Sequence, residues 1–81
     1  MAQWFHNLRL IRRFPGSVPT VEGLWFVDPA APDHLGKLDR ARKILAASRA
    51  ADPEATWELE TRGESGVWHK MEDTDVVRPQ L

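Results

Sequence analysis

The residue types best suited to binding chemistry lie close together near the start of the chain. Arginine stacks on aromatic rings and pairs bidentately with carboxylates, and Trp and Arg are enriched among the residues that dominate the binding energy of protein interfaces. The segment therefore predicts a protein-binding surface for a partner with an acidic or mixed surface. The residues of this surface are Trp4, Phe5, Arg9, Arg12 and Arg13. A structural alternative stays open, in which the two rings cap the hydrophobic core and the arginines pair with Glu58 and Glu60.

The basic residues also allow a second interpretation, a surface for nucleic acid. Residues 1–51 carry eight Arg or Lys against four Asp or Glu, whereas residues 52–75 carry eight acids against two basic residues. Basic side chains on one strand and one helix would neutralise phosphates. The residues of this alternative are Arg9, Arg12, Arg13, Lys37, Arg40 and Lys43. The net charge of −1 and the acidic second half would repel a nucleic-acid backbone, so a protein is the favoured partner.

Residues that support catalysis or metal binding are scattered. The histidines His6, His34 and His69 are not at the spacing of a local metal pair. The five glycines and three serines match no phosphate-binding loop or nucleophile motif. Alternating Glu58 and Glu60 are more typical of the water-facing side of a hairpin than of an acid–base pair. We therefore predict a non-enzymatic protein without catalytic residues, metal or cofactor.

Length and composition indicate a single domain over residues 1–81. The chain contains no cysteine, which excludes disulfides and thiolate metal sites and fits a reducing compartment. It has no run of about 18 apolar residues, and residues 1–14 lack the uninterrupted apolar stretch of a signal peptide. These features predict a cytoplasmic protein that does not associate with a membrane.

Hydrophobic spacing predicts the elements that hold these residues. Apolar side chains at three- to four-residue spacing, among them Leu35, Leu38 and Leu45, indicate a helix that begins with a side-chain cap from Asp33. Lys37, Arg40 and Lys43 face away from this stripe. The expected elements are strands over residues 4–14 and 20–28, a helix over about 33–51, and a hairpin of strands over 56–62 and 67–71 around a turn at 63–66.

The order of these elements predicts an α+β fold. A single small domain of β-β-α-β-β order would form one mostly antiparallel sheet, with the helix packed on one face. Residues 24–27 are apolar on both faces, which is typical of a central strand covered on both sides. One helix covers only one face, so the other would await a partner or a second copy in a homodimer. The acidic segment 72–81 is expected to be less ordered, apart from a short strand at Val76 and Val77.

The function that these features favour is a small interaction module. It would act as an adaptor or an inhibitor through the aromatic and arginine surface. Small phage and bacterial accessory proteins share this general length and composition, although no family motif is present. The alternative is a nucleic-acid-binding domain that uses the basic face of the first strand and the helix.

Overall fold

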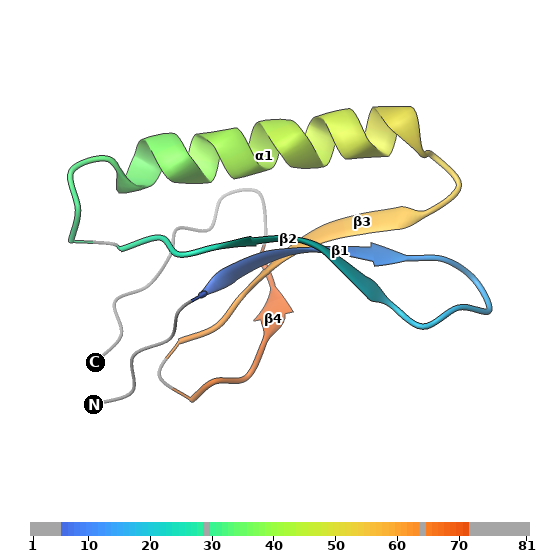
Figure 1. The fold of residues 1–81 in the computed structure, drawn as a ribbon, viewed down its shortest axis with the longest axis horizontal. Coiled ribbons are helices and arrows are strands. Elements are labelled where there is room, and N and C mark those ends of the chain that lie inside the picture. The colour runs from blue at the N-terminus through green and yellow to red at the C-terminus, as the bar shows by residue number, and fades with distance from the viewer. Residues whose placement is uncertain (1–5, 29, 64, 72–81) are drawn as a thin grey trace.

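The first strand of the sequence forms the centre of the sheet. The computed structural model describes residues 6–28, 30–63 and 65–71. The elements are β1 (Leu8–Arg13), β2 (Thr20–Trp25), α1 (His34–Ala51), β3 (Thr56–Thr61) and β4 (His69–Lys70). The strands pair antiparallel in the order β2-β1-β3-β4, and α1 lies across one face of this sheet (Figure 1). The predicted α+β class, the element order and the single helix on one face are confirmed.

The position of β2 differs from the prediction. Residues 24–27 predicted a central strand, but β2 lies at an edge and β1 occupies the central place. The reason is that β3, which follows α1, pairs with the second edge of β1 and presents Trp57 and Leu59 to the helix. At the corresponding place β2 has Gly23, which contributes no side chain to the core. The outer edge of β2 therefore has no partner strand among the described residues.

The strand register decides which side chains share a face. Arg12 of β1 is opposite Trp57 of β3, and both belong to the face that α1 covers. Arg9 is opposite Glu60, and because side chains alternate along a strand this pair lies on the face away from the helix. β1 and β3 therefore each have one face toward α1 and one face away from it.

The hydrophobic core lies between α1 and the sheet. Leu38, Ala41 and Leu45 are buried at three- to four-residue spacing, which confirms the middle of the predicted stripe. Leu35 was expected in the same stripe but is exposed, because the first turn of α1 extends beyond the ends of the strands (Figure 1). The other side chains of the core are Leu8, Leu10, Val27, Ala55, Trp57, Leu59 and Met71.

The entry into α1 depends on Asp28 and not on Asp33. The Asp33 side chain makes no capping hydrogen bond, because its backbone (φ −96°, ψ 7°) is not in the extended conformation of an ordinary N-cap. Asp28 instead accepts a hydrogen bond from the Ala30 backbone N–H through Oδ1, at 2.9 Å. Its carbonyl accepts another from the N–H of Ala31, also at 2.9 Å. The predicted Asp33 cap is therefore wrong, and a turn held by Asp28 leads the chain into the helix.

Two turns contain glycines in the left-handed region, and the second of them is the turn predicted at residues 63–66. Gly16 has a φ of 79° in the turn that closes with a bond from Ser17 N–H to the Phe14 carbonyl. Gly66 has a φ of 77°, and its N–H donates to the Gly63 carbonyl at 3.1 Å. Glycine adopts this backbone without the steric penalty of a Cβ atom. The second turn leads into β4, which is shorter than the predicted strand at residues 67–71.

Candidate functional site

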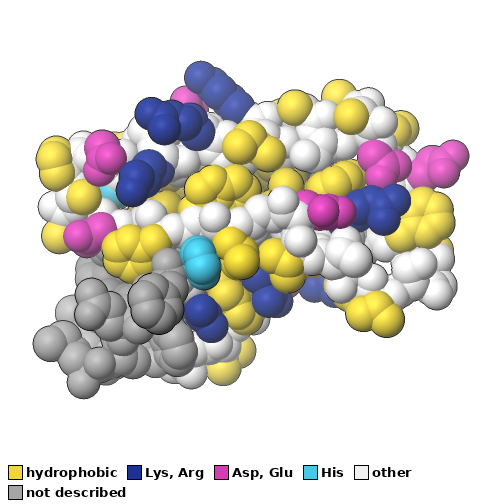
Figure 2. Space-filling view, viewed as in Figure 1, with side chains coloured by type: hydrophobic (Ala, Val, Ile, Leu, Met, Phe, Trp, Pro, Cys, Tyr) yellow, Lys and Arg dark blue, Asp and Glu magenta, His cyan; other side chains and the backbone are white. Residues whose placement is uncertain are grey.

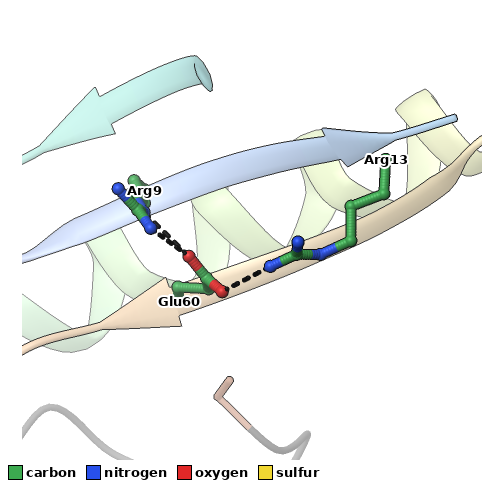
Figure 3. A network of polar contacts seen from close by, with 3 residues as sticks. All are labelled: Arg9, Arg13 and Glu60. Carbon is green, nitrogen blue, oxygen red and sulfur yellow. Dashed lines mark hydrogen bonds and ion pairs between the residues drawn. The ribbon is translucent and has the colours of Figure 1, made fainter. Parts of the chain in front are cut away.

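A buried carboxylate held by two arginines lies on the face of the sheet away from α1 (Figure 3). Glu60 accepts a hydrogen bond from Arg9 Nε at 2.8 Å and another from Arg13 Nη2 at 3.0 Å. The Glu60 side chain is only 8% exposed, so the prediction that it faces water is wrong. The cross-strand register explains the burial, because it brings two long cationic side chains of β1 over one carboxylate of β3.

Trp68 is the aromatic partner of these arginines. The guanidinium carbon of Arg9 lies 4.3 Å from the centre of the Trp68 ring, and that of Arg62 lies 4.4 Å from it. Both distances are within the range of a cation–π interaction. Trp4 and Phe5, which the sequence paired with the arginines, lie outside the described residues. No sequence pattern was used to predict a role for Trp68. Arg62 and Trp68 lie on either side of the predicted 63–66 turn, and this position could have indicated their contact.

Arg12 lies apart from Arg9 and Arg13, on the face that α1 covers. Its Nε donates to Asp52 Oδ2 at 2.8 Å, and its guanidinium lies 5.2 Å from the centre of the Phe14 ring. The three arginines of the predicted protein-binding surface therefore lie on two opposite faces of the sheet. Each is already paired with a carboxylate of the same chain, as the structural alternative proposed for Glu60.

The helix supplies the remaining basic residues of the nucleic-acid alternative. Lys43 pairs with Asp39 one turn earlier on α1, at 3.1 Å. Lys37 and Arg40 are exposed and make no ion pair with any residue of the described ranges. These two cations do not form one stripe with the arginines of β1, which are paired elsewhere.

Lys37 and Arg40 border a groove between the edge strand and the helix. We call it the β2–α1 groove; it has a volume of about 440 Å³ and is lined by His6, Leu24, Trp25, Phe26, Lys37, Arg40 and Ile44. Two of its apolar side chains are well exposed, Ile44 at 43% and Phe26 at 37%, whereas Leu24 is opposite Arg9 in the register, so its side chain lies on the face away from α1. Figure 2 shows hydrophobic side chains along the seam below α1, with Lys and Arg side chains above them on the helix.

The groove exists because α1 packs mainly on β3 and leaves β2 less covered. The two-sided apolar run at residues 24–27 predicted an uncovered apolar surface, and the groove contains part of that run. The helix spacing placed Lys37 and Arg40 away from the core, but it did not indicate that they border the apolar surface of β2. That proximity comes from the angle between the helix and the sheet, which a local sequence pattern does not contain.

Asn7 fixes the end of the segment that lines the groove. Its side chain donates to the Val27 carbonyl at 2.7 Å and accepts from the Val27 N–H at 2.8 Å. Its own N–H donates to the Trp25 carbonyl at 3.0 Å. Asn7 and Val27 are fully buried, so these bonds hold the backbone on either side of Phe26 in place. The role of Asn7 in holding the backbone beside the groove was not predicted, because a single polar residue near a strand has no distinctive sequence pattern.

The three histidines are dispersed in the structure as they are in the sequence. His34 Nδ1 lies 2.8 Å from the Ala31 carbonyl at the start of α1, and His6 borders the groove. Within residues 6–28, 30–63 and 65–71, no three His, Asp or Glu side chains lie close enough to hold a metal ion. In the same ranges, no helix has the length and apolar character needed to cross a bilayer.

The chain matches no protein family, no curated protein and no solved structure, so its site is interpreted from its own geometry and charge.

Proposed function

We propose that this chain is a small non-enzymatic protein-binding module that holds its partner in the β2–α1 groove. The observation that supports the proposal is the combination, in one place, of apolar side chains with cations that form no ion pair within the described part of the chain. Trp25 and Ile44 offer apolar area, and Arg40 beside them has no intramolecular carboxylate among the described residues. Exposed apolar patches with a polar rim are characteristic of interaction sites.

Only part of the aromatic and arginine segment predicted from the sequence is kept in the proposed binding surface. Arg9, Arg12 and Arg13 already have carboxylate partners, so recruiting them would first break those pairs. Trp4 and Phe5 directly precede His6, a residue of the groove, and stay part of the proposed surface. The chain has no cysteine that an oxidising compartment would use, and we place its action in the cytoplasm.

A nucleic acid fits the groove less well than a protein does. Phosphate binding requires several cations along one backbone track. The groove offers Lys37 and Arg40, while Lys43 on the same helix is paired with Asp39. The exposed apolar side chains between these cations and the edge of β2 would gain nothing from a phosphate backbone.

A capture experiment with matched variants tests the proposed function. The full chain is immobilised and exposed to a nuclease-treated lysate of its native host, as wild type, as the double variant Lys37→Glu/Arg40→Glu, and as Lys43→Glu. Both variants reverse positive charge on α1. Only Lys37 and Arg40 line the groove, whereas Lys43 does not. We expect a protein partner that wild type and Lys43→Glu retain and the double variant loses.

Two results would contradict the proposal. A partner retained equally by all three proteins would place the contact outside the groove. In a separate assay with added DNA, binding of single-stranded or duplex DNA that weakens steeply between about 50 and 200 mM salt would favour the nucleic-acid alternative.

A further inference from the structure

We propose that the occupant of the β2–α1 groove is an extended acidic segment of a partner protein, which adds to β2 as a further strand. This inference rests on the proposed function and specifies the chemistry and conformation of the partner. Three observations support it: the open edge of β2, the dimensions of the groove, and the sign of its charge.

The open edge supplies the backbone partner. β2 is the first strand in the order β2-β1-β3-β4, so one of its two edges has no hydrogen-bonded neighbour among the described residues. The N–H and C=O groups on such an edge pair readily with an extended segment of another chain. Asn7 holds the backbone at Val27, beyond the end of the strand, so the edge is presented in a fixed geometry.

The groove beside this edge suits one strand. β2 has six residues, a length of about 20 Å at the usual rise per residue of a strand. The 18 residues of α1 span about 27 Å, and the helix borders the groove with Lys37, Arg40 and Ile44 beside residues 24–26. A bound strand would direct every second side chain toward α1, where Trp25 and Ile44 offer apolar contacts.

The charge of the groove identifies the occupant as acidic. Lys37 and Arg40 border the groove without an ion pair to the described residues, and β2 contributes one acid, Glu22, which does not line it. Carboxylates of a bound segment would therefore meet cations for which the described residues supply no competing carboxylate. A second copy of the chain is a poorer occupant, because the strand that it would add to this edge, β2, contains only one acid, Glu22.

Peptide display tests the sequence of the occupant. Random ten-residue peptides are selected on the full-length wild type, on Lys37→Glu/Arg40→Glu, and on the control Lys43→Glu. We expect wild type and control to select Asp or Glu alternating with Val, Ile, Leu or Phe, and the double variant to select Lys or Arg in place of the acids. Peptides with helical spacing of apolar residues, or the same acidic peptides on all three proteins, would overturn the proposal.

Backbone methylation tests the conformation of the occupant. The best selected peptide is synthesised with N-methyl groups on its odd residues or on its even residues, and the affinities of both forms for the full chain are compared. Addition to a strand edge uses the N–H groups of alternate residues only. We expect one form to lose affinity at least tenfold, about 1.4 kcal/mol, and the other to bind nearly as well as the parent. Equal loss or equal binding of the two forms would exclude strand addition.

The chain's own acidic segment is the competing occupant that must be distinguished. Glu72, Asp73 and Asp75 precede Val76 and Val77, the same mixture of acids and β-branched residues that the groove would select. The full chain with Glu72→Gln, Asp73→Asn and Asp75→Asn should bind the selected peptide with unchanged affinity. If the affinity for the peptide rises tenfold or more, this segment competes for the groove. That result would overturn the proposal that a partner protein occupies it.

Failure of this inference and failure of the proposed function give different results. If a lysate partner depends on Lys37 and Arg40 but no alternating acidic peptide is selected, the proposed binding function is supported and the extended acidic occupant is rejected. A dimer in sedimentation equilibrium that dissociates when the selected peptide is added would assign the edge to a second copy.

Discussion

Asn7 replaces a strand partner for Val27. The amide side chain of Asn7 reaches the Val27 backbone and satisfies both its N–H and its C=O, at 2.8 and 2.7 Å. Buried backbone groups require such partners, because an unsatisfied group costs about 1–3 kcal/mol. Val27 follows β2 and packs in the core, so this pair of bonds joins the core to the edge strand that forms the groove.

Replacing Asn7 should therefore destabilise the fold strongly. Asn7→Ala leaves both Val27 groups buried without their partner, and we expect it to lower the free energy of unfolding by about 2–4 kcal/mol. Asn7→Asp keeps an acceptor for the Val27 N–H, but it places a negatively charged oxygen next to the Val27 carbonyl in place of a donor. At neutral pH it should lower the free energy of unfolding by at least as much. Urea denaturation measures both variants. A loss below about 0.5 kcal/mol for either would mean that water or another group replaces the amide.

The Glu60 cluster should matter more for stability than a surface ion pair. Glu60→Gln removes the charge that Arg9 and Arg13 share in a nearly buried site, and we expect a loss of about 1–3 kcal/mol. The comparison variant Asp39→Asn breaks the exposed pair with Lys43 and should change stability by less than about 0.5 kcal/mol. Denaturation of both variants at low and moderate salt provides the comparison. Equal effects would show that the burial of Glu60 adds nothing to its ion pairs.

Two glycine replacements should shift stability in opposite directions. A Cβ atom at Gly23 would lie 2.5 Å from an atom of the Trp25 ring, so Gly23→Ala must displace that ring and should cost about 1–3 kcal/mol. A Cβ atom at Gly36 meets nothing within 4 Å, and Gly36→Ala should stabilise α1 by about 0.5–1 kcal/mol. Thermal melting compares the variants. Stabilisation by both would indicate that the Trp25 ring moves without cost.

The buried side of α1 gives a simple check of the helix register. Leu38 is 1% exposed and Leu35 is 58% exposed, although both belong to the stripe that the sequence predicts. Leu38→Ala should cost about 2–5 kcal/mol, as large-to-small replacements in a core do. Leu35→Ala should stay within about 0.5 kcal/mol of wild type in chemical denaturation. Comparable losses would mean that the helix is rotated or that a further segment covers Leu35.

The local features of the fold could be predicted from the sequence. Apolar spacing at Leu38, Ala41 and Leu45 indicated the helix, and Gly16 and Gly66 indicated the turns. The central place of β1 could not be predicted in this way, because it depends on pairing with β3 across the intervening helix. Strand order is decided by which pairing buries the most apolar surface, and no local pattern reports that.

The candidate site was less predictable than the fold. The alternation of β3 placed Glu60 on the outward face correctly, but its burial requires Arg9 and Arg13 from another strand. The helix periodicity placed Lys37 and Arg40 away from the core, where an exposed role is the ordinary expectation. Only the packing of α1 on β3 brings these cations to the edge of β2.

The central position of β1 also has a consequence for how the chain folds. β1 and β2 are neighbours in the sequence and close a hairpin through a short loop, whereas Leu8 meets its partner Thr61 only after helix α1 has been passed. Such a non-local pairing is slow, since the entropy of closing a long loop is lost before the contacts form. During synthesis the ribosome releases the hairpin first, with both of its edges exposed. The nascent chain is therefore most prone to aggregation before β3 has emerged, and a rate-limiting docking of β3 onto β1 should dominate its refolding kinetics.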